Sequence, residues 1–126
     1  MTRLLFSSHS QAWKRHIRQP GDLFAPLTEA ARNDVLAAEP DAPLADLPPF
    51  GAIQRAALAD AFEQAQAILD ALQADDHWTR LLSYRGYDLR SMAHKNLFFA
   101  LEDAARVHHV ARAAVDAYPG SEAILL

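Results

Sequence analysis

The longest hydrophobic pattern of the chain covers residues 88–117. Apolar residues recur there at alternating steps of four and three, a spacing that keeps them on one face of a helix. The members of this stripe are Ala93, Leu97, Ala100, Ala104, Val107, Ala111, Ala114 and Tyr118. A stripe of this length must be covered, so we predict a long amphipathic helix that packs against another element.

A second long helix is predicted over residues 50–74, where apolar residues follow the same rhythm. They are Leu58, Phe62, Ala65, Leu69 and Leu72, with Ile53, Ala57, Ala61 and Ile68 beside them. Each stripe needs an apolar surface to cover it, and in one small chain this is best achieved when the two helices pack against each other as an antiparallel pair. Residues 75–87, which join them, are rich in aromatic and Leu side chains and are interpreted as a buried bridge.

Two shorter helices and two apolar ends complete the predicted fold. One helix runs from Ser8 or Ser10 to Ile17, with Trp13 and Ile17 on one side, and the other runs from the N-cap Thr28 to Ala38. Residues 39–49 hold four Pro and form a connection, fixed to the body by Leu44 and Leu47. Residues 3–7 and 122–126 are candidate short strands that pair with each other; otherwise the last strand pairs with a partner chain or with sequence beyond it.

These elements predict a mainly α fold in which two long antiparallel helices are flanked by two shorter ones, in a single domain of residues 1–126. The composition agrees, because 26 of the 126 residues are Ala. The chain has no Cys, which excludes disulfides and thiolate sites. Its apolar start is too short for a signal peptide or a membrane span, so we expect a soluble cytoplasmic protein.

The net charge of −4 is unevenly distributed. Residues 1–18 hold four basic and no acidic side chains, residues 19–79 hold eleven acidic and two basic ones, and residues 80–126 hold six basic and five acidic ones. The ends and the middle are therefore complementary and can neutralise each other on packing. A basic surface for phosphate-bearing ligands is the alternative, and nucleic acid is disfavoured by the low pI of about 5.8.

No complete catalytic or metal-binding constellation is present. His108 and His109 are adjacent and would diverge by about 100° on a helix, so they cannot chelate one ion. The four Gly are scattered singly and form no phosphate-binding loop, so no cofactor is predicted.

Basic and aromatic side chains alternate around Gly86, just before the last helix. The set is Arg80, Tyr84, Arg85, Tyr87, Arg90, His94 and Lys95. A helix N-terminus with Arg side chains nearby suits a phosphate or carboxylate, so this set is a candidate anion-binding site. In the alternative interpretation, the Tyr residues border the core and the Arg residues pair with Asp75, Asp76 and the acidic helix before them.

Residues 84–89, Tyr-Arg-Gly-Tyr-Asp-Leu, precede a long helix, a Pro-Gly loop and the apolar segment at residues 122–126. This order resembles the amino-terminal region of bacterial surface-polysaccharide glycosyltransferases, where a similar turn leads into a helix and then into the first nucleotide-binding-type strand. The resemblance implies that this chain is an amino-terminal portion whose catalytic and sugar-nucleotide residues lie beyond residue 126.

The sequence therefore favours a non-catalytic helical module that acts through protein-protein contact or self-association, with a protein partner or a homodimer expected. The amino-terminal part of a sugar-nucleotide-dependent glycosyltransferase and an anion- or nucleotide-binding helical protein remain as alternatives.

Overall fold

The computed structural model describes all 126 residues, and 59% of them lie in five helices, which confirms the predicted mainly helical class. The chain forms two compact units, which we describe separately. The sheet unit contains residues 1–53 and 107–126, and the helical unit contains residues 54–106. No helix combines the length and the hydrophobicity that crossing a membrane requires.

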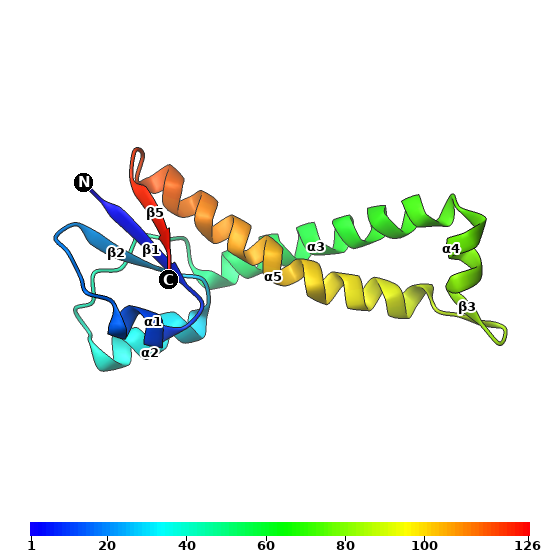
Figure 1. Cartoon of the computed structure of the whole chain (residues 1–126), viewed down its shortest axis with the longest axis horizontal. Coiled ribbons are helices and arrows are strands. Elements are labelled where there is room, and N and C mark those ends of the chain that lie inside the picture. Colours follow the sequence, from blue (N-terminus) through cyan, green and yellow to red (C-terminus); the bar gives the residue numbers. More distant parts are fainter. The chain divides into compact units, whose positions relative to one another are not determined.

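Three parallel strands in the order β2-β1-β5 form the centre of the sheet unit (Figure 1). They are β1 (Arg3–Ser7), β2 (Asp22–Pro26) and β5 (Glu122–Leu125), and helix α1 (Ser10–Arg15) connects the first two. The predicted pairing of the two ends of the chain is confirmed, because Leu4 lies opposite Ala123 and Leu5 opposite Ile124.

Strand β2 was not predicted. The sequence interpretation treated Leu23 and Phe24 only as anchors for the following helix, whereas they pair in register with Leu4 and Leu5 of β1. Parallel strands that are covered on both faces lack the alternation of polar and apolar residues that identifies an exposed strand. The run Leu23-Phe24-Ala25 therefore gave no periodic signal.

Hydrophobic clusters cover both faces of this sheet. Successive residues of a strand point to opposite faces, so Leu5 of β1 faces one cluster, whereas Leu4 and Phe6 face the other. The first cluster consists of Leu5, Trp13, Phe24, Ala31 and Val35. The second consists of Leu4, Phe6, Ala25, Leu27, Ala45, Ile53, Val110 and Ala114. The sheet unit thus has three layers, with α1 and α2 on one side of the sheet.

Helix α2 (Glu29–Ala38) has the predicted cap, because the side chain of Thr28 accepts a hydrogen bond from the Ala31 N–H at 3.1 Å. The prediction for the first helix is correct only in part. Trp13 is buried, but α1 ends at Arg15 and Ile17 is largely exposed, since the chain leaves the helix before Ile17 reaches the core side.

Asp22 is the main buried acid of the sheet unit, with 4% of its surface exposed. Its carboxylate accepts two hydrogen bonds from Arg3, at 2.6 and 2.8 Å, and one from the Gln19 N–H at 2.8 Å. The ring of His16 lies 3.3 Å from the same carboxylate. These contacts fix the amino-terminal ends of β1 and β2. The hydrogen bond from Arg3 holds the pKa of Asp22 well below its usual range.

We expect the Asp22→Asn variant to lose stability at neutral pH and to show a weaker acid dependence than the wild type. Because the pKa of Asp22 is lowered on folding, its contribution is present above the unfolded pKa of about 4 and is lost as the pH falls toward the folded pKa. Thermal unfolding at pH 7 and near pH 3 measures both effects. Asp41→Asn, at an exposed position, is the control. Equal acid dependence in the wild type and the Asp22→Asn variant would contradict the assignment.

The helical unit contains most of α3 (Phe50–Gln73) and of α5 (Arg90–Ala117), joined by α4 (Asp76–Leu81), β3 (Ser83–Tyr84) and β4 (Tyr87–Asp88). Two contacts join the long helices inside this unit. The Gln54 side chain donates a hydrogen bond to Glu102 at 2.8 Å, and the rings of Phe62 and His94 lie 4.8 Å apart.

The apolar stripes predicted for the two long helices agree only in part with the residues that are buried. In α3 the buried side chains are Ile53, Ala57, Ala61, Ala65 and Leu69, spaced four apart, whereas Leu58, Phe62 and Ile68 are exposed. In α5 the stripe residues Ala100, Ala104 and Val107 are exposed, whereas Ala114 is buried as predicted, together with Ala105 and Val110 from outside the stripe. Small side chains on the inner face allow close contact, so the bulkier residues remain at its border.

Residues 75–87 do not form the predicted buried bridge. Apart from the half-buried Leu82, every residue of this stretch is exposed, including Trp78, Leu81, Tyr84 and Tyr87. The short α4 and the two-residue strands are held by local hydrogen bonds, and their aromatic side chains Trp78, Tyr84 and Tyr87 remain 42–71% exposed.

Candidate functional site

The predicted anion site is built around a tight hairpin at the end of the helical unit. Tyr84 pairs with Tyr87 across the two strands, and the turn between them has positive φ angles of 49° at Arg85 and 80° at Gly86. Positive φ at both central residues is typical of the type I′ turns that close two-residue hairpins. The Arg85 guanidinium lies 5.2 Å from the centre of the Tyr84 ring.

Arg90, at the start of α5, is held by Asp88 rather than by Asp75 or Asp76. The Asp88 carboxylate accepts hydrogen bonds from the Arg90 side chain at 2.5 to 2.9 Å and from the Arg90 N–H at 2.9 Å. These bonds lower the pKa of Asp88. Because Asp88 neutralises this guanidinium and caps the helix, the attraction of the helix start for an external anion is reduced.

Arg90 and His94 line one cavity of about 410 Å³ within the helical unit. The other lining residues are Phe62, Gln66, Leu69, Gln73, Asp88 and Ser91. The Nε2 atom of His94 is buried and has no hydrogen-bond partner. The cavity therefore presents amide, hydroxyl and imidazole groups beside the Asp88–Arg90 ion pair, over an apolar wall.

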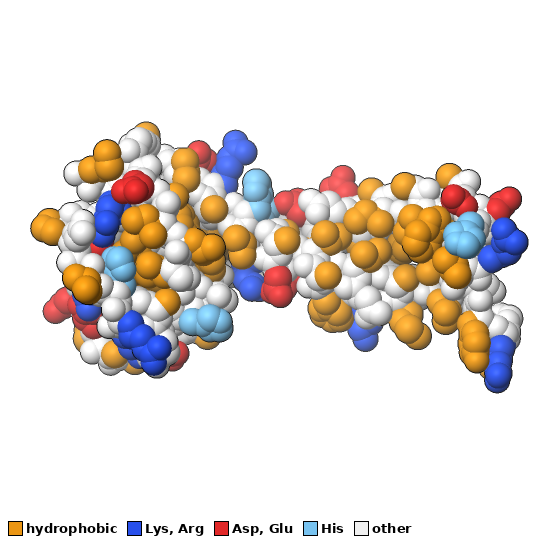
Figure 2. Space-filling model, in the orientation of Figure 1, with side chains coloured by type: hydrophobic (Ala, Val, Ile, Leu, Met, Phe, Trp, Pro, Cys, Tyr) orange, Lys and Arg blue, Asp and Glu red, His pale blue; other side chains and the backbone are white.

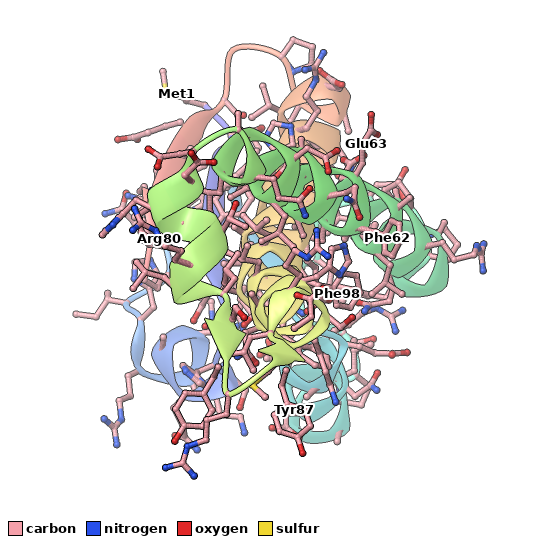
Figure 3. All side chains as sticks on the ribbon, turned by 90° about the vertical axis from the view of Figure 1, so that its right-hand side faces the viewer. Met1, Phe62, Glu63, Arg80, Tyr87 and Phe98 are labelled. Atoms are coloured by element: carbon pink, nitrogen blue, oxygen red, sulfur yellow. The ribbon has the colours of Figure 1, made fainter.

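The five other residues of the predicted site do not line this cavity. Arg80 and Tyr87 extend in different directions from the end of the unit (Figure 3). Tyr84, Arg85 and Lys95 are exposed as well. The structure thus brings Arg90 and His94 together and leaves the remaining basic side chains spread over the surface.

The most prominent feature of the helical unit is the number of large hydrophobic side chains on its surface. Phe62 is 58% exposed, Phe99 57% and Met92 60%. Leu58, Ile68, Trp78, Leu81, Tyr84 and Tyr87 are also exposed. Figure 2 shows hydrophobic side chains distributed over the visible face of this unit. Large exposed hydrophobic patches are typical of protein or membrane interaction sites, of ligand-binding grooves and of aggregation-prone surfaces.

The buried residues of the helical unit are correspondingly small. They are Ala57, Ala61, Ala65, Leu69 and Ala105. Four of these five are Ala, so the fully buried interior of the unit contains only one large hydrophobic side chain, that of Leu69. Sequence reasoning predicted the two apolar helices but assigned Phe62 and Leu58 to the interior. The width of the apolar arc on α3, which exceeds what one neighbouring helix covers, was the available signal.

Comparison with known proteins returns no similarity: no protein-family model matches the chain, and neither the curated proteins nor the solved structures include a match.

Proposed function

We propose that this chain is a non-catalytic module that self-associates, and that the helical unit of one copy pairs with the helical unit of a second copy. In this proposal α3 and α5 run antiparallel in each copy, as supported by the contacts of Gln54 with Glu102 and of Phe62 with His94. The observation that carries the proposal is the exposure of nine large hydrophobic side chains of this unit, among them Phe62, Met92 and Phe99.

The energetic argument concerns these large side chains. Complete burial of a Phe, Leu or Met side chain is worth about 1.5–3 kcal/mol. The interior of the helical unit is built mainly from Ala, which supplies little of this energy. Aromatic residues and Met are also the types that are enriched in protein interfaces. Pairing of two units would cover Phe62 and Phe99 and stabilise both copies.

The distribution of charge favours a second copy as the partner. Residues 60–76 hold five acidic side chains and no Lys or Arg, whereas residues 80–95 hold four basic side chains and one acidic one. A two-fold dimer repeats each contact twice. If the acidic segment of one copy faces the basic segment of the other, both contacts join opposite charges, which favours association and fixes its orientation.

The experiment compares the Phe62→Ser/Phe99→Ser double variant with the wild type by size-exclusion chromatography and light scattering at several concentrations. We expect the wild type to have twice the mass of the chain and the variant to dissociate, with the Kd raised about tenfold or more. Circular dichroism verifies that the helices persist.

The matched control is Ile17→Ser/Leu125→Ser, which removes two exposed hydrophobic side chains from the sheet unit. This control should remain dimeric. A wild type that stays monomeric at every concentration would refute the proposal, as would equal weakening by both double variants.

A second candidate is the amino-terminal part of a sugar-nucleotide-dependent glycosyltransferase. The parallel order β2-β1-β5 with helices on both faces supports it, because nucleotide-binding domains of the doubly wound class have this construction. A chain that stays monomeric at every concentration would favour this candidate over self-association.

A further inference from the structure

A cavity of about 590 Å³ lies in the sheet unit, at the edge where β2 ends. The chain around Leu44 runs parallel to β2: the Phe24 N–H donates to Pro43 O, and the Ala45 N–H donates to Phe24 O, both at 2.8 Å. The pairing does not continue beyond these residues, because Pro26 at the end of β2 and Pro48 and Pro49 in the neighbouring segment have no N–H to donate. The two segments separate there, and the cavity opens between them.

The walls of this cavity are largely preformed. Pro26, Leu44, Leu47 and Phe50 supply an apolar surface, and the Leu and Phe side chains are half-buried against the two core clusters. The Asp46 N–H donates to the Tyr118 hydroxyl at 2.8 Å, which fixes the outer wall. Apolar walls with a few polar groups are typical of small-molecule sites.

Three charged side chains line the cavity from two sides. Glu29 and Arg32 belong to α2, and Asp46 belongs to the segment that leaves the sheet. All three are exposed, and the ion pairs of the structure include none of them. The cavity thus presents one guanidinium and two carboxylates that are free to bind a ligand.

We propose that this cavity binds a small zwitterionic ligand of the apolar amino-acid class. The ligand carboxylate pairs with Arg32, the ammonium group pairs with Glu29 and Asp46, and the apolar body lies against Leu44, Leu47 and Phe50. The position at the carboxyl end of a parallel strand is the usual one for ligands of open α/β sheets. The site lies entirely in the sheet unit, so it is independent of the self-association of the helical unit.

Three probes with one common aromatic body test this inference: L-phenylalanine, L-phenylalaninamide, which lacks the carboxylate, and 3-phenylpropanoate, which lacks the ammonium group. Each is titrated into the ¹⁵N-labelled chain and followed by NMR. We expect L-phenylalanine to bind at least about tenfold more tightly than either analogue, because each analogue lacks one of the two charged groups that form ion pairs with the cavity. The Asp46 and Leu47 amide signals should shift.

The variant Arg32→Gln separates ion pairing from general binding. It should lower the affinity for L-phenylalanine to that of the amide and leave the affinity for the amide unchanged, whereas Arg15→Gln, at an exposed position of α1 outside the cavity, should change neither. The inference is overturned if L-phenylalanine does not bind at about 10 mM, if the three probes bind equally, or if Arg32→Gln weakens all of them alike.

Discussion

Replacement of Trp13 with Ala is expected to lower the free energy of unfolding of the sheet unit by about 3–5 kcal/mol. The side chain is fully buried, and its ring stacks on Phe24 with the centres 5.1 Å apart. The guanidinium of Arg18 lies 4.7 Å from the ring. Helix α1 has only six residues, which is too short to be stable without tertiary contacts. Trp13 is its only buried large side chain, so the variant loses both a core contact and the attachment of this helix.

Urea unfolding followed by circular dichroism measures this loss. The control is Trp13→Phe, which keeps an aromatic ring against Phe24 and leaves a smaller cavity, so its loss should be clearly smaller than that of the Ala variant. A loss below about 1 kcal/mol for Trp13→Ala would mean that the cluster of Leu5, Phe24, Ala31 and Val35 does not depend on this ring.

Local signals predicted the helices well. Thr28 caps α2 as predicted, and the long helices extend over nearly the predicted ranges, at Phe50–Gln73 and Arg90–Ala117. These features depend on residues close in sequence, so propensity, capping and breaks at Pro and Gly suffice to place them. The pairing of the two ends was also predicted, because the apolar run of Leu4 to Phe6 was the available partner for a terminal strand.

Features that depend on distant residues were predicted less well. The run from Leu23 to Ala25 becomes strand β2 only because Leu4 and Leu5 lie beside it, and three apolar residues carry no period of their own. The buried face of α3 was predicted only in part, because Ala65 and Leu69 are buried as predicted whereas Leu58 and Phe62, assigned to the same stripe, are exposed. The observed inner face consists of Ala57, Ala61 and Ala65, which permit close contact.

In the candidate sites, too, local features were predicted and features that depend on other parts of the structure were not. The sequence indicated the turn at Gly86 and the start of the helix, but the neutralisation of Arg90 depends on the cap geometry of Asp88, which composition alone does not reveal. The cavity beside Arg32 could not be predicted, since it depends on the unpredicted strand β2 and on the alignment of Leu44 with Phe24.

Exchange of charge between two variants is expected to convert the proposed homodimer into an obligate heterodimer. In the first variant, Glu63→Lys/Asp70→Lys/Asp76→Lys, the net charge of residues 60–76 changes from −5 to +1. In the second, Arg80→Glu/Lys95→Glu, the net charge of residues 80–95 changes from +3 to −1. Each variant alone repels a second copy of itself, whereas the two together attract each other, so each should be monomeric alone and dimeric after mixing.

The five positions are suitable because all are exposed and none contributes to the buried face of α3 or α5. Glu63 points away from the body of α3, as seen in Figure 3, and its replacement leaves the helix unchanged.

Light scattering of each variant and of the equimolar mixture measures the result, and native mass spectrometry identifies the heterodimer. Added salt should weaken the mixed dimer and strengthen each homodimer, because it screens attraction in the first and repulsion in the second. If the mixture dimerises no better than its components, the partner of the helical unit is not a second copy of this chain, and the exposed side chains of Phe62, Met92 and Phe99 require a partner of a different kind.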